Sequence, residues 1–271
     1  MQYKAIVLDL DGTLTNDDKL ITPRTLQALM DAQHLGVRIV LASGRPPHGI
    51  QYVADELQLS ENHGYILAFN GGQILSCQDG QLMYSQELSP SFVPELYLAA
   101  IENQFEILTY QTDTIESTSD TNPYIVKAST TNRMPIVKCP EFVHQIHYPI
   151  YKCLIVGDPS RMATFEKKLA RQMEGRMNIF CSTAFFLECA PLGIDKANAL
   201  QQLFEKLHIP RESVIAFGDG HNDISMIRYA GLGVAMQNAD DEVKANADIV
   251  TASNNDDGVA LIVEKYILHA K

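Results

Sequence analysis

The sequence lacks any run of about 18 uninterrupted apolar residues, which is the length that a helix needs to cross a bilayer. It also lacks a long apolar signal region after Met1, low-complexity tracts and internal repeats. Positive charge is scarce, because 21 Lys and Arg face 33 Asp and Glu, for a formal charge of −12. This balance opposes nonspecific attraction to nucleic acid and to anionic membranes. We therefore expect a folded cytoplasmic protein without nucleic-acid or membrane partners.

Cysteine is also sparse, and the five cysteines are odd in number and form no CxxC pair. Three of them lie in or beside apolar segments. We expect reduced, mostly buried thiols rather than disulfides or a thiolate metal site. The five are Cys77, Cys139, Cys153, Cys181 and Cys189.

The N-terminal third alternates between strand-like and helix-like patterns. Apolar, β-prone segments at 5–10, 37–42 and 65–69 are separated by helical stripes at 22–36 and 50–57. Such β-α-β-α-β spacing indicates parallel strands with right-handed helical crossovers. Ligands of such sheets bind beyond the carboxyl ends of the strands.

The pattern changes in the middle of the chain, where polar, threonine-rich stretches and scattered short strands replace the regular alternation. The α/β alternation resumes with a helix at 196–207 and continues to the C-terminus. We predict an α/β fold in which 1–83 and 190–271 form one Rossmann-like parallel-sheet core. Residues 84–189 are predicted to form an inserted α/β cap domain.

The first candidate site residues are Asp9 and Asp11, two apart at the end of the first predicted strand. In an extended chain, alternate side chains share a face, so both carboxylates can point into one site. Two carboxylates there favour a divalent cation, and one of them could attack phosphorus while the other handles a proton. The alternative is a loop of solvated acids.

A second acidic cluster, Gly218-Asp219-Gly220-His221-Asn222-Asp223, follows another apolar strand. Asp219 and Asp223 could complete an oxygen-rich shell of the kind that magnesium prefers. Asp223 could instead only cap the helix that follows. We expect His221 to face solvent, because magnesium prefers oxygen ligands.

Phosphate-binding groups are offered by Ser43 and Lys196. Ser43 follows the second strand, where its hydroxyl and the amides of Gly44 and Arg45 can bind phosphate oxygens near a helix N-terminus. Lys196 lies at the start of a helix, where a cation opposes the helix dipole and so indicates a role other than helix stability. A solvent-exposed lysine is the alternative.

Weaker candidates for substrate contact are Arg45, Asn70 and Gly71. Arg45 could contact phosphate or reach toward the inserted domain. Asn70 and Gly71 follow the third strand at the border of the expected pocket, although turn chemistry alone also explains an Asn-Gly pair.

Together, Asp9-Leu10-Asp11-Gly12-Thr13, Ser43-Gly44-Arg45-Pro46, Lys196 and the second acidic cluster resemble the four motifs of haloacid dehalogenase (HAD) hydrolases, in their usual order. The long insertion, Phe69-Asn70-Gly71-Gly72 and Asn246-Ala247-Asp248-Ile249-Val250 are similar to the Cof-type subgroup, subfamily IIB, which carries a large α/β cap of the C2B type. The resemblance spans nearly the whole chain.

The resemblance implies that Asp9 is the nucleophile and that Asp11 is the general acid and base. Ser43 and Lys196 would hold the phosphoryl group, and Asn222 would position neighbouring groups. The implied magnesium ligands are Asp9, the backbone carbonyl of Asp11, Asp219 and, directly or through water, Asp223.

The resemblance also implies a magnesium-dependent phosphatase that acts on a small phosphorylated metabolite through an aspartyl-phosphate. By family analogy, sugar phosphates are the first expected substrates, followed by cofactor phosphates such as pyridoxal phosphate or flavin mononucleotide. The cap would set specificity by closing over the phosphate. We expect a monomer.

Two alternatives remain. A phosphomutase would use the same aspartate but needs a second phosphate site in the cap, and a non-catalytic binding protein would keep the fold without turnover. The cap's basic residues are dispersed in sequence, so the sequence does not reveal whether they cluster. They are Lys127, Arg133, Lys138, Lys152, Arg161, Lys167, Lys168, Arg171 and Arg176.

Overall fold

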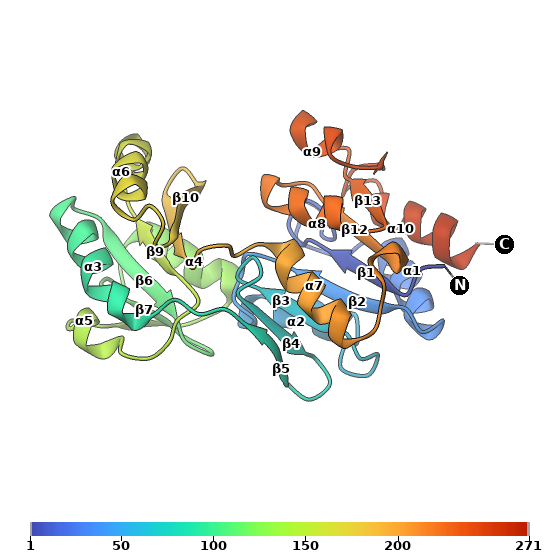
Figure 1. The fold of residues 1–271 in the computed structure, drawn as a ribbon, viewed down its shortest axis with the longest axis horizontal. Helices are drawn as coiled ribbons and strands as arrows, with labels where there is room; N and C mark the ends of the chain where they lie inside the picture. The colour runs from blue at the N-terminus through green and yellow to red at the C-terminus, as the bar shows by residue number, and fades with distance from the viewer. Residues whose placement is uncertain (1, 270–271) are drawn as a thin grey trace. The chain divides into compact units, whose positions relative to one another are not determined.

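The computed structural model describes residues 2–269 and divides the chain into two compact units (Figure 1). The first unit contains the residues up to 44, 50–85 and those from 195 onward, and the second contains 45–49 and 86–194. The second unit and the predicted insertion, 84–189, have different ends. The assignment of this segment as a substrate-closing cap domain stays a prediction.

An eight-stranded sheet forms the centre of the first unit, with the strand order β14-β13-β12-β1-β2-β3-β4-β5. The strands from β14 to β3 are parallel, and β4 and β5 continue the sheet as antiparallel neighbours. The strands are β1 (Ala5–Leu8), β2 (Arg38–Ala42), β3 (Tyr65–Ala68), β4 (Gln73–Ser76), β5 (Leu82–Ser85), β12 (Val214–Gly218), β13 (Leu232–Ala235) and β14 (Ile249–Val250).

Helices cover this sheet, and α7 and α8 pack on one of its faces (Figure 1). The helix that follows the second acidic cluster, α8, is preceded by a 3₁₀ turn that contains Asp223. The helical segments are α1 (Pro23–His34), α2 (His48–Glu56), α7 (Lys196–Lys206), η2 (Arg211–Ser213), η3 (His221–Asp223), α8 (Ile224–Tyr229), α9 (Asp241–Ala245), α10 (Gly258–Val263) and the π-helical η4 (Glu264–Leu268).

Burial explains why the central strands carry the site at their ends. All four residues of β1 are buried, because β1 lies between β12 and β2 and is packed on both faces. Its alternate residues Ala5 and Val7 contact the α7 side of the core, where Leu200 and Leu203 are buried. The first polar residue after such a strand therefore emerges at its carboxyl end.

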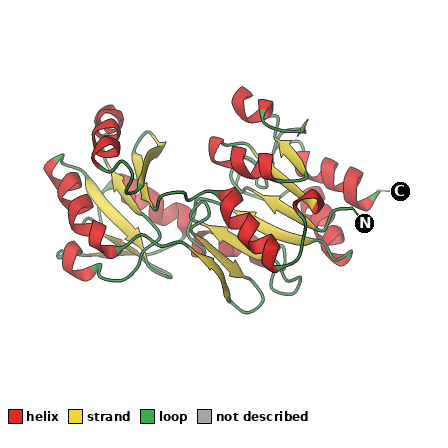
Figure 2. Ribbon diagram, in the orientation of Figure 1, coloured by secondary structure: helices red, strands yellow, loops and turns green. Residues whose placement is uncertain are grey.

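The second unit contains a six-stranded sheet with the order β10-β11-β9-β6-β7-β8. Figure 2 distinguishes the strands of the chain from its helices by colour. Adjacent strands of this sheet are antiparallel, except for β7 and β8, which are parallel. The strands are β6 (Glu106–Tyr110), β7 (Ile115–Ser117), β8 (Ile136–Lys138), β9 (Cys153–Val156), β10 (Asn178–Thr183) and β11 (Phe186–Ala190).

A separate hydrophobic core holds this second unit together. Residues of α3, α5 and α6 pack against one face of the sheet, with Phe105 and Phe165 in tilted ring contact at 4.9 Å. The helices are η1 (Pro90–Phe92), α3 (Val93–Glu102), α4 (Pro123–Asn132), α5 (Phe142–Gln145) and α6 (Pro159–Gln172).

The predicted α/β class with a parallel-sheet core is confirmed. All five cysteines are free thiols; Cys139, Cys153 and Cys189 are buried, whereas Cys77 and Cys181 are partly exposed. Within residues 2–269, no helix has both the length and the apolar character that a bilayer crossing requires.

Candidate active site

The site begins with Asp9, the first residue after β1. Its amide donates to the carbonyl of Phe217 in β12, so the parallel ladder continues one residue beyond the strand and fixes the Asp9 backbone. The residue is only 8% exposed. A carboxylate held by a buried strand end has little freedom to move, which suits a group that must attack along one line.

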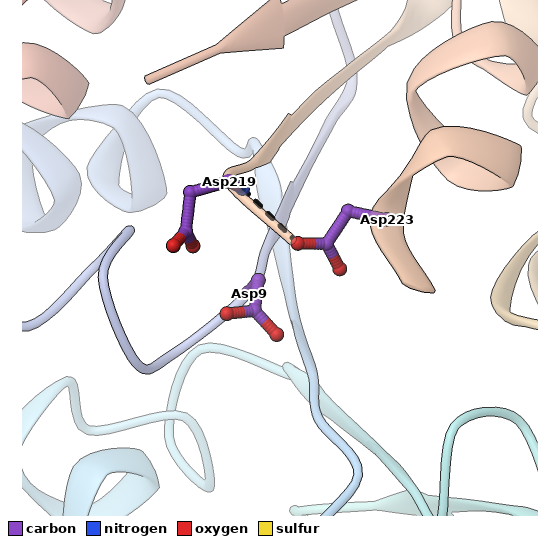
Figure 3. Close-up of side chains that lie close together, drawn as sticks. All are labelled: Asp9, Asp219 and Asp223. Atoms are coloured by element: carbon purple, nitrogen blue, oxygen red, sulfur yellow. Dashed lines mark hydrogen bonds between the residues drawn. The ribbon is translucent and has the colours of Figure 1, made fainter. Parts of the chain in front are cut away.

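Three carboxylates meet where β1 and β12 end. Asp9, Asp219 and Asp223 offer oxygens within 4.8 Å of one another, and Figure 3 shows their carboxylates converging from two strand ends and the turn before α8. Asp223 Oδ2 also accepts hydrogen bonds from the amides of Asp219 (3.1 Å) and Gly220 (2.9 Å). Asp223 therefore closes the loop before its helix as well as contributing to the site.

Lys196 supplies the positive charge at the centre of this group. Its ammonium donates to Asp9 Oδ1 (2.7 Å), to Asp223 Oδ1 (2.6 Å) and to the carbonyl of Ala42 (2.7 Å). The residue is 1% exposed, so the solvent-exposed alternative for this lysine is wrong. Burial by itself lowers the pKa of Lys196, but the Asp223 and Asp9 carboxylates outweigh burial and raise it.

The pKa values of two carboxyl groups in the site are raised, because one lysine faces three buried or partly buried acids. Burial, together with repulsion from Asp223, raises the pKa of Asp9 well above its usual range, although Lys196 opposes that effect. Burial also raises the pKa of Asp219 to about 6, against a lowering effect of the Thr13 hydroxyl. A second cation would relieve this surplus of negative charge.

Asp11 lies apart from the three-carboxylate group. Its Oδ1 contacts Lys19 Nζ at 2.9 Å, and the Asp11 side chain is 38% exposed. The backbone between Asp9 and Asp11 belongs to a tight loop in which Gly12 has φ +87°. A side chain on Gly12 would collide with Asp219, since a Cβ there would lie 2.3 Å from Asp219 Oδ2. Only glycine permits this approach.

The expected phosphate-binding residues border the same strand ends. Ser43 is buried directly after β2, next to the Ala42 carbonyl that accepts from Lys196. Asn222 Nδ2 donates to Asn70 Oδ1 at 3.1 Å, and a Cβ on Gly44 would lie 3.0 Å from Asn70 Nδ2. Segments from four separate parts of the chain are thus brought together.

The turn after β3 is held in unusual backbone conformations. Phe69, Asn70 and Gly71 all have positive φ, at +54°, +57° and +106°. A Cβ on Gly71 would lie 2.4 Å from the Asp195 carbonyl, so glycine is required there. Two consecutive non-glycine residues in the left-handed region indicate that the surroundings enforce this turn.

Arg45 contacts the segment that was predicted as the inserted domain, which is one of the two interactions expected for it. Its guanidinium donates to the carbonyls of Gly49 (3.4 Å) and Thr131 (3.3 Å), all three being residues of the second unit. His221 faces solvent as expected, with a side chain 60% exposed beside Asp240 and Glu242.

Sequence reasoning missed Thr13 and Lys19. The Thr13 hydroxyl donates to Asp219 Oδ1 at 2.7 Å and so joins the two acidic motifs. Its position two residues after Asp11, past a glycine that turns the chain, was the available signal. Lys19 gave none, because its contact with Asp11 depends on the path of an irregular loop.

The donor set fits a hard divalent cation. Asp9, Asp219 and Asp223 provide oxygen ligands only, which is the chemistry that magnesium selects. Among residues 2–269, no other group of three or more His, Cys, Asp or Glu side chains is gathered closely enough to bind a metal ion.

Comparisons with known proteins agree with this geometry. The family model for haloacid dehalogenase-like hydrolases matches residues 6–263. The 5-amino-6-(5-phospho-D-ribitylamino)uracil phosphatase YcsE of Bacillus subtilis is 33% identical over 274 residues, covering 99% of this chain and 97% of that protein.

Two solved structures share the fold over nearly their full length. A haloacid dehalogenase-like hydrolase from Bacteroides thetaiotaomicron has a TM-score of 0.94 and 45% identity, covering 98% of this chain and 100% of that one. A HAD subclass IIB sugar phosphatase has a TM-score of 0.82 and 25% identity, covering 97% and 98%. The predicted enzyme class, a HAD-like phosphoric monoester hydrolase, is confirmed. The chain belongs to the haloacid dehalogenase-like hydrolase family.

Proposed function

We propose that this enzyme is a magnesium-dependent phosphatase that hydrolyses a small phosphomonoester through an aspartyl-phosphate on Asp9. One observation carries the proposal: a buried carboxylate at a strand end is held by a buried lysine inside a group of three acids. This arrangement combines a fixed nucleophile with charge that can neutralise a phosphoryl group.

The first half-reaction transfers the phosphoryl group to the enzyme. An Asp9 carboxylate oxygen forms a bond to phosphorus while the bond from phosphorus to the ester oxygen breaks. Asp11 gives its proton to that leaving oxygen, so the alcohol departs neutral. The partial exposure of the Asp11 side chain is consistent with a group that meets both substrate and water.

The second half-reaction returns Asp9 to its carboxylate form. Asp11, now ionised, takes a proton from a water molecule whose oxygen forms a bond to phosphorus. The bond between phosphorus and the Asp9 oxygen then breaks, and inorganic phosphate is released. The same residue therefore acts first as acid and then as base.

The transferred group carries negative charge that the protein must offset. We assign Ser43, Gly44, Lys196 and Asn222 to the phosphate. Ser43 and Gly44 follow β2, Lys196 contacts Asp9 after β1, and Asn222 follows β12 and bonds to Asn70 beside Gly44. Phosphoryl transfer depends mainly on such positioning and charge neutralisation. Asn70, Gly71 and Arg45 remain proposed substrate contacts, of which Arg45 is weakest because its guanidinium donates to carbonyls of the second unit.

Magnesium would be held by Asp9, Asp219 and Asp223 with the backbone carbonyl of Asp11. When bound, it would supply positive charge beside the phosphoryl oxygens and keep Asp9 ionised. Lys196 alone leaves the three carboxylates with surplus negative charge, which is the electrostatic reason to propose a metal.

For the substrate we propose a small phosphorylated metabolite. The comparisons include a phosphatase of a phosphoribitylamino-uracil and a sugar phosphatase. Sugar phosphates remain the first class to test, followed by cofactor phosphates and their precursors.

Phosphate release from sugar, nucleotide and cofactor phosphates, each assayed with magnesium and with excess chelator, tests the proposal. Wild type should release phosphate only with magnesium, and Asp9→Asn should lower turnover by at least about 10³-fold while remaining folded. Asp55→Asn is the matched control, because Asp55 is an exposed residue of α2 whose carboxylate accepts from the Gln51 side chain and does not belong to the three-carboxylate group. Turnover that survives in Asp9→Asn contradicts the nucleophile assignment, and release without metal contradicts the magnesium requirement.

A further inference from the structure

Two asparagines far along the chain hold the loop that carries Asp11. Asn238 follows β13, and Asn254 lies between β14 and α10. Asn238 Nδ2 donates to the carbonyl of Gly12 at 2.8 Å. Asn254 Nδ2 donates to the carbonyl of Thr15 at 3.1 Å and to Asp17 Oδ1 at 3.2 Å.

The two asparagines are also joined to each other. The backbone amide of Asn254 donates to Asn238 Oδ1 at 3.1 Å. The oxygen and the nitrogen of the Asn238 side chain therefore each have a partner. Asn255 adds two further bonds to Asp17, one from its side chain and one to its side chain. We call Asn238 and Asn254 the asparagine brace.

The brace acts on a loop that also has internal support. The amides of Leu14 and Thr15 donate to the carbonyls of Asp9 and Leu10, and the Thr15 hydroxyl also donates to Leu10. On its other side, Thr13 holds Asp219. The asparagine brace therefore fixes the outward-facing carbonyls of a loop whose inner side chains contact the acidic group.

Burial distinguishes the two members of the brace. Asn254 is 5% exposed, so its side-chain amide is largely shielded from water and depends on these partners for its hydrogen bonds. Asn238, in contrast, is exposed. A buried side chain that bonds to one backbone carbonyl and to a second loop residue has little rotational freedom. Such a side chain can hold the loop at Thr15 and Asp17 in one position.

We infer that the asparagine brace is a positioning device for the reaction, which sets the place of Asp11 relative to Asp9 and Asp219. This inference rests on the proposed function for its kinetic consequences. The side chains of both asparagines bond to residues 12–17 rather than to the three-carboxylate group, so they act on the site through this loop. Substrate binding depends instead on Ser43 and Lys196, which the brace does not touch.

A misplacement of about 1 Å in a catalytic group can cost about 10²-fold in rate. Asn238→Asp keeps the acceptor for Asn254 but removes the donor to Gly12. We expect kcat to fall by about 10- to 100-fold with KM within about twofold, because ground-state binding is unchanged. Asn254→Ala is the second variant and should act in the same direction.

The control is Asn246→Asp, which makes the same change in charge in the same unit. Asn246 follows α9, and its Nδ2 donates to the carbonyl of Glu242 in that helix at 2.7 Å, away from the loop of residues 12–17. This control should keep kcat within about twofold. Thermal midpoints of all variants separate a loss of position from a loss of folded protein.

Hydrogen exchange of the metal-free protein, measured without substrate, tests the brace independently of turnover. Amides of residues 12–17 should exchange at least about tenfold faster in Asn238→Asp than in wild type or Asn246→Asp, with the rest of the first unit unchanged. Unchanged exchange in this loop, or equally faster exchange throughout the unit, overturns the inference. If wild type released no phosphate while the loop exchange changed as expected, the proposed function would fail and the positioning of the loop would stand.

Discussion

A lysine is buried against carboxylates in each unit, and the two sites differ in their balance of charge. In the first unit, Lys196 faces Asp9 and Asp223, with Asp219 close by. In the second, Lys152 Nζ contacts Glu188 Oε2 at 2.8 Å, and the two side chains are 7% and 8% exposed. One site has three acids for one base, whereas the other is paired one to one.

Both carboxylate oxygens of Glu188 in the balanced pair accept hydrogen bonds, one of them from Lys152. Glu188 Oε1 accepts from the Ser182 hydroxyl at 2.8 Å, and Lys152 Nζ lies 5.6 Å from the centre of the Tyr110 ring. A pair of this kind needs no further ion and serves the structure of the sheet. The unbalanced site, by contrast, has surplus negative charge that a second cation would offset, and such surplus charge is more typical of a functional site than of a structural ion pair.

The largest expected effect is on turnover when Lys196 is replaced. Lys196→Met removes the cation that we assign to the phosphoryl group and leaves three carboxylates unneutralised, so we expect kcat to fall by about 10³-fold. Lys206→Met is the matched control, because Lys206 lies exposed at the end of the same helix. Steady-state kinetics corrected for the folded fraction by circular dichroism measure the effect. A loss smaller than about tenfold contradicts the role given to Lys196.

The corresponding change in the second unit should act on stability. Lys152→Met leaves the Glu188 carboxylate buried and unpaired, which should lower the free energy of unfolding by about 3 kcal/mol. The double variant Lys152→Met with Glu188→Leu should recover most of this loss, because no buried charge remains. Urea unfolding measures both variants. If the double variant were no more stable than the single one, the desolvated charge would not be the cause.

The carboxyl ends of the central strands were predictable from sequence, because local patterns specify them. Asp9 follows a continuous apolar run, and Thr22 with Pro23 marks the start of α1, where the Thr22 side chain accepts from the Thr25 amide. Lys196 was identified by its unfavourable place at a helix start. In each case the residue and its signal are neighbours in the chain.

Contacts between distant segments were not predictable. Lys152 and Glu188 lie 36 residues apart, and the register of β9 against β11 that brings them together depends on the packing of the whole sheet. Lys152 was therefore only one of the dispersed basic residues considered for a second phosphate site. The contacts of the asparagine brace were not predicted for the same reason, since Asn238 lies 226 residues after Gly12.

Metal binding should stabilise the unbalanced site and leave the balanced one alone. Magnesium at about 100 times its Kd should raise the free energy of unfolding by about 2.7 kcal/mol, since the folded state binds it and the unfolded chain does not. Asp219→Asn should remove most of this gain by removing a ligand charge, whereas Asp55→Asn should keep it. Thermal unfolding with and without magnesium measures the gain. An equal gain in wild type and Asp219→Asn contradicts the metal site.

The smallest expected effect is a pH dependence of the metal-free protein. Because the pKa of Asp219 is raised to about 6 from an ordinary value near 3.8, the folded state binds a proton more tightly than the unfolded state does. Stability from this group is therefore full below about pH 4 and is lost as the pH rises through about 6. Asp219→Asn should be the more stable protein at pH 7, by about 1 to 2 kcal/mol, and should lose that advantage near pH 4.

The asparagine in this variant can still accept from the Thr13 hydroxyl, so the comparison isolates the charge. Burial and the neighbouring acids also raise the pKa of Asp9, but that residue is present in both proteins and its contribution largely cancels. Urea unfolding in chelator at several pH values measures the difference. A stability difference that stayed constant between pH 4 and 7 would mean that folding does not raise the pKa of Asp219. The surplus negative charge that distinguishes the Lys196 site from the Lys152 site would then come from Asp9 and Asp223 alone.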